Sequence, residues 1–362
     1  MEISATSGSA RAGVVTTHRG SFRTPCFMPV GTRASVKALS SLDMEELGAE
    51  VILANTYHLM LRPGAELIAE MGGIGSFSAW PGQVLSDSGG YQVFSLTPRI
   101  DDDGVTFRSV YDGSEHRLTP EDAVRIQELL GADIQMVLDV CAPWPSSRSE
   151  LRLAVERTTA WACRAKAARR RDDQGLFGIV QGGTDSLLRA ESAQRTVEIG
   201  FDGYGVGGLS VGEPRSEMLS SLAAAIEHLP TDRPRYLMGL GDPVGMVEAV
   251  ALGVDMFDCV LPTRLARHGT VLTSAGRIQL RNAQWANDPG PLDPNCECPV
   301  CARWSRAYLR HLVNVGEPSA SRLLSWHNLA WTLDLMARVR SAVCRGGHAL
   351  DGLRREIASV WG

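Results

Sequence analysis

This sequence of 362 residues contains almost no lysine, and it has no long apolar run. Only Lys37 and Lys166 are lysines, and the net charge is −5, which excludes a uniformly basic nucleic-acid-binding protein. No apolar run approaches the roughly 20 residues that a membrane-spanning helix needs. The N-terminal residues, MEISATSGSARAG, lack the apolar segment of a signal peptide, so we expect a cytoplasmic protein without a membrane anchor.

Arginine supplies almost all of the positive charge. A guanidinium group is planar and can donate two parallel hydrogen bonds to a phosphate group or a base edge, which an ammonium group does less well. A bias in genome composition would give the same excess, so composition leaves the choice between these explanations open. In either case, a site for a polyanion must be a local cluster of arginines.

Short apolar runs followed by amphipathic stretches recur along the chain. This alternation, repeated about eight times, predicts a (β/α)8 TIM barrel, an α/β fold, with an open doubly wound sheet as the alternative. The predicted strands are CFMPV (26–30), VILANT (51–56), VLSDSG (84–89), IQMVLD (134–139), LFGIVQG (176–182), GYGVGG (203–208), YLMGL (236–240) and MFDCVLP (256–262).

Two segments interrupt this rhythm. Alternating residues and the YDGS turn predict an inserted hairpin near 94–120. The second insertion carries three clustered cysteines and precedes a long helical C-terminus. We therefore predict a barrel core at 1–269, a zinc-binding subdomain at 270–327, and C-terminal helices at 328–362 that complete the barrel.

Polar residues and glycines cluster at the C-terminal ends of the predicted strands, where barrel enzymes carry their active sites. A lone aspartate there is more often a helix cap, and glycine pairs usually form turns. Their coincidence on so many strands nevertheless favours a site, and the strand ends carry Asp87-Ser88, Asp139, Gln181, Gly208-Leu209 and Asp258.

The chemistry of these groups suggests glycosyl transfer at a purine base. Two carboxylates that flank an anomeric carbon are the usual equipment of that reaction. A third acid accepts hydrogen bonds from ring and amino N–H groups, and an amide donates to a carbonyl, so together they match the edge of a guanine-like base. Glycine turns let backbone N–H groups approach such a ligand closely.

The cysteine cluster is a separate feature. Cys296, Cys298 and Cys301 supply three thiolates within six residues, and a histidine would complete a closed tetrahedral zinc site. His327 and His311 are both candidates for the fourth ligand, and spacing alone does not choose between them. A closed set of four ligands indicates a structural Zn2+ site rather than a catalytic one.

Taken together, the motifs DSGGYQ, VQGG, GGLSVGE, MFDCVLPTR and CECPVC resemble those of tRNA-guanine transglycosylases of the bacterial queuosine pathway. The resemblance runs from about residue 10 to the C-terminus. It implies a (β/α)8 barrel with an inserted zinc subdomain. It also implies an enzyme, a pentosyltransferase that exchanges guanine 34 of GUN anticodons in tRNA for a 7-deazaguanine base.

The resemblance assigns a role to each candidate residue. Asp258 would be the nucleophile, forming a covalent ribosyl intermediate, and Asp87 would be the general acid and base. Arg264 and Arg267, in the basic loop behind Asp258, would bind the anticodon loop. The base would be bound by Ser88, Tyr91, Asp139, Gln181, Gly208, Leu209 and Met238. Zinc would be held by Cys296, Cys298, Cys301 and His327, which favours His327 over His311.

Three positions bear on substrate preference. Relatives carry an acid at the position of Val140, so the finer base preference is open. Asp242 stands where many relatives have a basic or neutral residue, so RNA contact there would be weaker. Val211 is bulkier than the residue of the eukaryotic type, and we therefore expect the smaller base, preQ1, as substrate rather than queuine.

An aromatic pattern suggests self-association. Trp304, Tyr308 and His311 would share one helix face, with Arg303, Arg306 and Arg310 on an adjoining face. Such a stripe is more often core than interface, but a small zinc subdomain has little core, so we expect a homodimer.

Other functions remain as alternatives. They are a non-catalytic RNA-binding subunit of the same fold, a deazapurine transglycosylase that acts on DNA, and a barrel glycosidase. The glycosidase explains the acids but not the zinc loop or the arginines.

Overall fold

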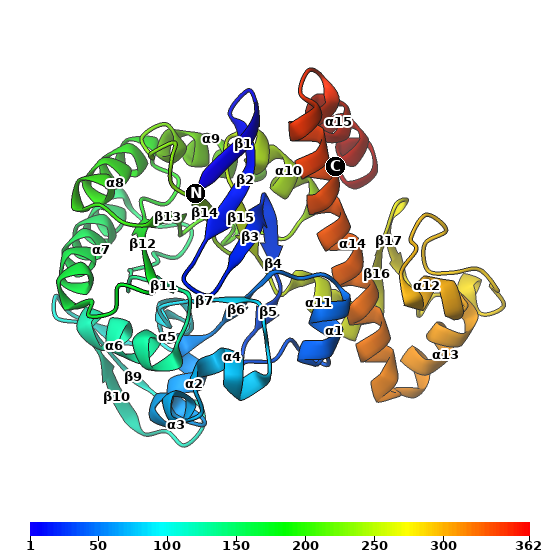
Figure 1. Ribbon diagram of the computed structural model, residues 1–362, viewed down its shortest axis with the longest axis horizontal. Helices are drawn as coiled ribbons and strands as arrows, with labels where there is room; N and C mark the ends of the chain where they lie inside the picture. Colours follow the sequence, from blue (N-terminus) through cyan, green and yellow to red (C-terminus); the bar gives the residue numbers. More distant parts are fainter.

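The computed structural model describes residues 1–362, and a single parallel sheet lies at its centre (Figure 1). Its strands are β4 (Cys26–Met28), β5 (Val30–Gly31), β6 (Val51–Ala54), β7 (Gln83–Ser86), β11 (Ile134–Met136), β12 (Gly175–Val180), β13 (Gly203–Val206), β14 (Arg235–Leu237) and β15 (Met256–Asp258). All eight predicted strands are present, although most end earlier than the apolar runs do.

The sheet closes on itself. Its order is β4-β15-β14-β13-β12-β11-β7-β6-β5, and only Pro29 separates β4 from β5. Proline has no N–H to donate, so it divides one strand into two short pieces. Because β4 pairs with β15 and β5 pairs with β6, the two ends of the sheet meet. The barrel prediction is therefore confirmed, and the open doubly wound sheet is wrong.

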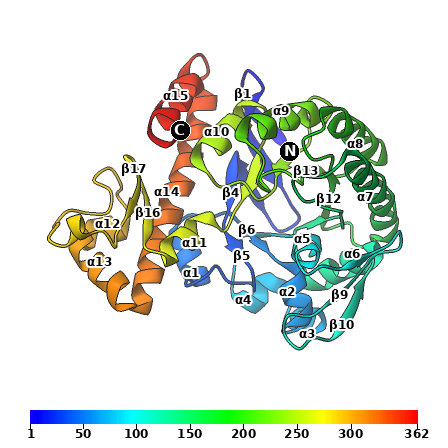
Figure 2. The same cartoon turned by 180° about the vertical axis from the view of Figure 1, so that it is seen from behind.

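Helices cover the outside of the barrel (Figures 1 and 2). α6 begins with Thr119 as its cap and Pro120 in its first turn, a combination that favours the start of a helix. The helices are α1 (Ser41–Glu46), α2 (Thr56–Leu61), α3 (Ala65–Glu70), α4 (Gly73–Ser78), α5 (Gly90–Phe94), α6 (Pro120–Leu130), α7 (Arg148–Ala168), α8 (Ser186–Ile199), α9 (Arg215–Ile226), α10 (Pro243–Ala251) and α11 (Leu261–Arg267).

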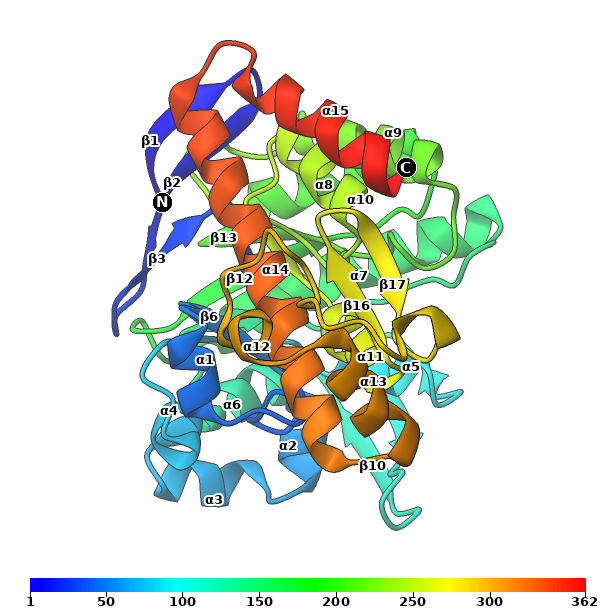
Figure 3. The same ribbon diagram turned by 90° about the vertical axis from the view of Figure 1, so that its right-hand side faces the viewer.

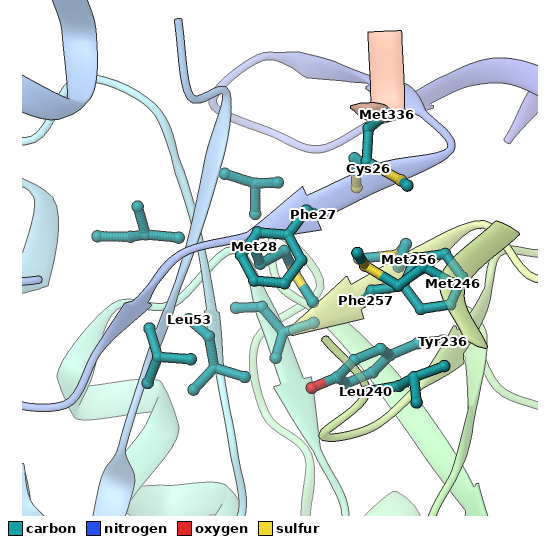
Figure 4. Packing of buried hydrophobic residues seen from close by; sticks show 14 of the residues in the cluster. Cys26, Phe27, Met28, Leu53, Tyr236, Leu240, Met246, Met256, Phe257 and Met336 are labelled. Carbon is teal, nitrogen blue, oxygen red and sulfur yellow. The ribbon is translucent and has the colours of Figure 1, made fainter. Parts of the chain in front are cut away.

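Large apolar side chains fill the space between strands and helices (Figure 4). Phe27, Met28, Leu53 and Phe257 are all buried there. Parallel strands need apolar residues on both faces, which is why they appear in the sequence as continuous apolar runs rather than alternating ones. Tyr236 is the polar exception among the labelled residues of the close-up, and its hydroxyl has a role described below.

A three-stranded antiparallel sheet at the N-terminus was not expected from the sequence. It consists of β1 (Glu2–Ser7), β2 (Ala10–Thr16) and β3 (Ser21–Thr24). Arg11 of β2 forms a buried ion pair with Asp255, at 2.5 Å, and donates to the carbonyl oxygens of Thr231 and Arg233. Asp255 precedes β15, so this sheet lies at the N-terminal end of the barrel strands.

The segment between α5 and α6 forms a second antiparallel sheet. It contains β8 (Arg99–Ile100), β9 (Val105–Arg108) and β10 (Glu115–Leu118), in the order β10-β9-β8. Phe107 on β9 packs in a separate apolar cluster with Tyr57 of α2 and Trp161 of α7. The inserted strands are thereby fastened to the outside of the barrel.

The C-terminal part packs against one side of the barrel (Figure 3). α14 passes residue 327 without a break, so the predicted boundary between zinc subdomain and C-terminal helices falls inside a helix; the division into domains stays a prediction. The elements are β16 (Thr270–Thr273), β17 (Gly276–Gln279), the 3-10 helix η1 (Ala283–Trp285), α12 (Pro299–Arg303), α13 (Arg306–Val315), α14 (Pro318–Arg345) and α15 (Ala349–Trp361).

The predicted aromatic helix face is only partly present. Trp304 ends α12 in an extended conformation, and Ser305 caps a new helix, α13, through a hydrogen bond from the Tyr308 N–H. Trp304 therefore does not share a helix with Tyr308 and His311, and the single-helix stripe is wrong. Tyr308 is nevertheless 46% exposed.

None of the helices combines the length and the apolar character that crossing a membrane would demand.

Candidate active site

Asp258 occupies the last position of β15, at the mouth of the barrel. Its Oδ1 accepts hydrogen bonds from the Tyr236 hydroxyl at 2.5 Å and from the Gly239 N–H at 2.8 Å. No protein group donates to Oδ2. Burial raises the pKa of this carboxyl, and the two donors act in the opposite direction. One oxygen is thus fixed and the other is available for attack on a substrate.

Asp87 follows β7 and is held by the segment that begins α2. Its Oδ1 accepts from the Thr56 N–H at 2.8 Å and from the Gly89 N–H at 3.2 Å, and Asn55 donates to its Oδ2. Burial raises the pKa of Asp87 to about 6 despite these donors. A carboxyl that titrates near neutral pH is suited to both giving and taking a proton.

Asp139 and Gln181 form a pair across two neighbouring strands. The Gln181 side-chain N–H donates to Asp139 Oδ2 at 2.6 Å, and both residues are buried. Burial raises the pKa of Asp139 to about 6, and the Asp87 charge adds to the effect. Asp139 and Asp87 therefore lie close enough to interact electrostatically, and the pair presents an acceptor and an amide together, as a purine edge requires.

Two glycines make this pair possible. A Cβ on Gly208 would lie 2.3 Å from Gln181 Oε1, and one on Gly207 would lie 2.8 Å from Gln181 Nε2. Gly208 also has a φ of +63°, which a residue with a side chain adopts only with strain. The glycine-rich motif after β13 is thus explained by close packing against the side chains of Gln181 and Asp139.

Arg189 of α8 supports the same turn and was not identified from the sequence. It is fully buried, and its guanidinium donates to the carbonyl oxygens of Val180, Gly183, Gly207 and Gly208. Burial lowers its pKa to about 10. Because its partners are backbone oxygens rather than an acid, no sequence pattern marks it. Tyr236 and Asn55 were missed for a similar reason: each acts through a spatial partner.

The remaining predicted base-binding residues surround the same mouth. Ser88 is buried and accepts from the Gly90 N–H at 3.2 Å, and Leu209 is buried beside Gly208. Tyr91 of α5 is 64% exposed at the rim. Met238, after β14, is half-buried, and its sulfur lies 3.4 Å from where a Cβ on Gly205 would be.

The three positions that bear on substrate preference, Val140, Asp242 and Val211, have distinct surroundings. Val140 points into the outer apolar cluster with Tyr57 and Trp161, away from Asp139 and the mouth. Asp242 caps α10 and pairs with Arg215 at 2.9 Å. Val211 is half-buried and lines a cavity of about 60 Å³ that also touches Gly208.

The two predicted RNA-binding arginines lie on α11, directly after Asp258. Arg264 is exposed and Arg267 is half-buried, and neither has a carboxylate within 4.0 Å. They are therefore free to bind an anion beside the nucleophile.

The four predicted metal ligands converge at one point outside the barrel. Their ligand atoms all lie within 4.8 Å of one another, and His327 Nδ1 is 3.3 to 3.8 Å from the three sulfurs. His327 Nε2 faces the Leu272 carbonyl at 2.8 Å, so Nε2 carries the hydrogen and the Nδ1 lone pair points at the sulfurs. Three thiolates and one neutral imidazole fit a closed tetrahedral Zn2+ site. His311 lies exposed on α13, outside this cluster.

An eight-stranded barrel whose mouth brings together two carboxylates and an acid–amide pair that matches a purine edge is suited to transferring a pentosyl group between bases. This chain is an enzyme of that class, a pentosyltransferase. A family model described as queuine tRNA-ribosyltransferase matches residues 6–359. The chain belongs to this family.

Individual relatives support the same assignment, and each is named queuine tRNA-ribosyltransferase. The protein of Desulforudis audaxviator is 54% identical over 337 residues, 92% of this chain and 91% of the relative. The protein of Herpetosiphon aurantiacus is 52% identical over 93% of this chain and 86% of the relative. The protein of Caulobacter vibrioides is 51% identical over 99% of this chain and 97% of the relative.

Proposed function

We propose that this protein exchanges guanine 34 of GUN anticodons in tRNA for a 7-deazaguanine base in queuosine synthesis, by double displacement at the ribose C1′. The observation that carries the mechanism is the state of Asp258. Two donors hold one of its oxygens, and the other has no hydrogen-bond donor from the protein. A nucleophile needs such an oriented and unblocked oxygen.

In the first displacement, Asp258 Oδ2 attacks C1′ and the bond from C1′ to the guanine nitrogen breaks. Asp87 supplies a proton to the departing base. In the second, the incoming base returns a proton to Asp87 as its nitrogen attacks C1′, and the bond from C1′ to Asp258 breaks. Asp258 is restored as a carboxylate, and no other reactant is needed.

Base recognition is assigned to the far wall of the mouth. Asp139 accepts from the N–H groups of the purine edge and Gln181 donates to its carbonyl, while Gly208 and Leu209 present backbone groups. Ser88 assists at the same edge. Tyr91 and Met238 enclose the two faces of the ring, and Arg264 and Arg267 bind phosphates of the anticodon loop. Such a loop must splay out its target base for this chemistry.

We propose preQ1 as the incoming base. The cavity that touches both Gly208 and Val211 is only about 60 Å³ in volume, which favours a base with a small substituent. Steady-state efficiency with queuine should be far below that with preQ1, and Val211→Gly should narrow the gap. Equal efficiencies in the wild type would refute the preference.

Zinc would be a structural component. Cys296, Cys298, Cys301 and His327 would hold it, and it would tie α12 and the loop before it to α14. It would take no part in the displacement, since the four ligands leave no open position.

We also propose a cytoplasmic homodimer. The cytoplasm is where the proposed tRNA substrate is found, and all eight cysteines are free of disulfides. The exposed ring of Tyr308, with His311 on the same helix and Trp304 beside it, supports the dimer. Light scattering at micromolar concentration should give twice the chain mass, and Tyr308→Glu should give a monomer. A monomeric wild type would refute it.

The exchange of labelled guanine into a GUN-anticodon tRNA transcript tests the function directly. The wild type should incorporate label, and Asp258→Asn, which keeps the side-chain shape, should not. Denaturing electrophoresis should show a covalent protein–RNA species for the wild type alone. A folded but inactive wild type would instead favour a non-catalytic RNA-binding subunit, or a DNA substrate, which a matching DNA stem–loop would reveal.

A further inference from the structure

Positive charge is distributed unevenly around the barrel mouth. Beside the strands that carry the proposed base-binding residues, three arginines are engaged: Arg148 pairs with Asp185 at 2.9 Å, Arg215 pairs with Asp242, and Arg189 is buried against carbonyl oxygens. The adjoining strands β15, β4/β5 and β6 follow one another around the closed sheet. The arginines that follow them have no carboxylate within 4.0 Å, and they are Arg33, Arg62, Arg264 and Arg267.

Arg33 and Arg62 converge on one aromatic ring, that of Tyr111. Arg33 lies in the loop after β5, Arg62 directly after α2, and Tyr111 in the turn between β9 and β10. The Arg62 guanidinium carbon is 4.6 Å from the centroid of the Tyr111 ring, and that of Arg33 is 5.3 Å away. The Tyr111 hydroxyl lies 2.8 Å from Nδ1 of His58. Three separate segments therefore meet at this cluster.

The cluster is fixed to the segment that holds the catalytic acid. His58 packs edge-on against Tyr57, whose hydroxyl accepts from the Val110 N–H at 3.1 Å. Tyr57 follows Thr56, the residue whose N–H holds Asp87. Tyr111 thus lies beside the Asp87 side of the mouth, whereas α11 lies beside the Asp258 side. Figure 2 shows the β9–β10 strands next to α2, apart from α11.

The charged groups that face the cluster leave the guanidiniums free. Burial, and then the Arg33 charge, lowers the pKa of His58. Asp112 is the neighbouring acid, and Ser114 donates to its Oδ1 through both its N–H, at 3.1 Å, and its hydroxyl, at 2.6 Å. Hydrogen bonds from Ser114, followed by smaller effects that include the Arg62 charge, lower the pKa of Asp112 to about 2.

We propose that Arg33, Arg62 and Tyr111 form a second RNA-backbone site, which binds phosphates on the side of the target nucleotide away from Arg264 and Arg267. This inference rests on the proposed function. A ribose between Asp258 and Asp87 leaves the RNA strand to continue past α11 in one direction and past Tyr111 in the other. Guanidinium forks match phosphate oxygens, and stacking on Tyr111 holds two flexible side chains in place before RNA binds.

The test compares steady-state guanine exchange by the wild type and by the Arg33→Ala/Arg62→Ala double variant at several salt concentrations. The double variant should raise the KM for tRNA roughly tenfold and flatten its salt dependence by about 1.4 units of log–log slope, about 0.7 for each lost phosphate contact. The kcat and the KM for free guanine should stay within about twofold. Tyr111→Leu should raise the KM for tRNA by a smaller factor, because both arginine charges remain but no longer stack on an aromatic ring.

Arg355→Ala is the matched control, because Arg355 is exposed on α15 and has no ion pair. An unchanged KM for tRNA and an unchanged salt slope in the double variant would overturn the second site. A fall in kcat together with a lower melting temperature would also overturn it, since it would show that the cluster only fastens the inserted strands to α2.

Binding of an anticodon stem–loop RNA, followed by fluorescence anisotropy, separates this inference from the proposed function. If the wild type binds RNA but does not exchange guanine, the proposed function fails. Weaker binding by the double variant would then still support the second site. Equal binding by the wild type and the double variant would overturn it.

Discussion

Tyr236 donates its phenolic hydrogen to Asp258 Oδ1 at 2.5 Å, between two neighbouring barrel strands. Removing this donor by Tyr236→Phe should raise the pKa of Asp258, because the hydrogen bond stabilises the carboxylate. Attack requires the ionised form, so the acidic limb of the kcat/KM profile should move to higher pH. The kcat should fall about tenfold, as expected for losing a hydrogen bond to a charged group.

Tyr204→Phe is the control for this change. Its hydroxyl accepts a hydrogen bond only from the Phe201 N–H, at 3.4 Å, far from the mouth. Its pH profile should match that of the wild type. An unshifted acidic limb in Tyr236→Phe would show that Tyr236 fills space without tuning the nucleophile.

Asp139→Asn should trade activity for stability. The pKa of Asp139 is about 6 in the folded protein against 3.8 for the free group, so the folded state holds the proton more tightly. The stability that this proton contributes is fully present below about pH 4 and is lost as the pH rises through about 6. The neutral Asn avoids this loss and keeps an oxygen for Gln181. The free energy of unfolding of Asp139→Asn should exceed that of the wild type by about 3 kcal/mol at pH 8. This difference should vanish near pH 4.

Denaturant unfolding at both pH values measures this difference, and guanine exchange measures the accompanying loss of base binding. Asp172→Asn, at an exposed position, should not change either curve. If Asp139→Asn were no more stable than the wild type at pH 8, burial would not destabilise the Asp139 carboxylate in the folded protein.

The sequence predicted the barrel because buried parallel strands are uniformly apolar, and each of the eight runs marked one strand. It did not predict β1 to β3. Their buried positions include Ala10 and Ala12, whose small side chains leave no strong apolar pattern, and the buried Arg11 resembles a surface residue until Asp255 is placed beside it.

The candidate site divides in the same way. Asp87, Asp139, Gln181 and Asp258 were predictable as a group because each lies at or shortly after the C-terminal end of a strand, and the closed sheet brings these ends together. Arg189 was not predictable, since it binds only backbone oxygens. Val140, at the position where relatives carry an acid, left the finer base preference open, and its side chain packs in the outer apolar cluster with Tyr57 and Trp161.

Removing one zinc ligand should lower stability without a direct effect on chemistry. Cys298→Ser should lose the metal, measured as zinc per chain by elemental analysis, and should melt at a lower temperature. Cys163→Ser, at an exposed free cysteine, should keep both the metal and the melting temperature. His311→Ala should keep the metal, whereas His327→Ala should lose it, because only His327 faces the sulfurs. Retention of zinc by His327→Ala would contradict the assigned ligand set.

Gly208→Ala should abolish base binding through a single methyl group. The added Cβ would lie 2.3 Å from Gln181 Oε1, so Gln181 would have to move and would release Asp139 from its hydrogen bond. The backbone strain alone is matched by Gly316→Ala, since Gly316 has a φ of +75° and no heavy atom within 4 Å of its Cβ position. Gly316→Ala should lose about 1 kcal/mol of stability from backbone strain, and Gly208→Ala should lose more because of the added clash and the broken hydrogen bond. Only Gly208→Ala should raise the KM for guanine, by about 100-fold or more. Equal guanine KM values in the two variants would mean that the turn after β13 does not position the base-reading pair.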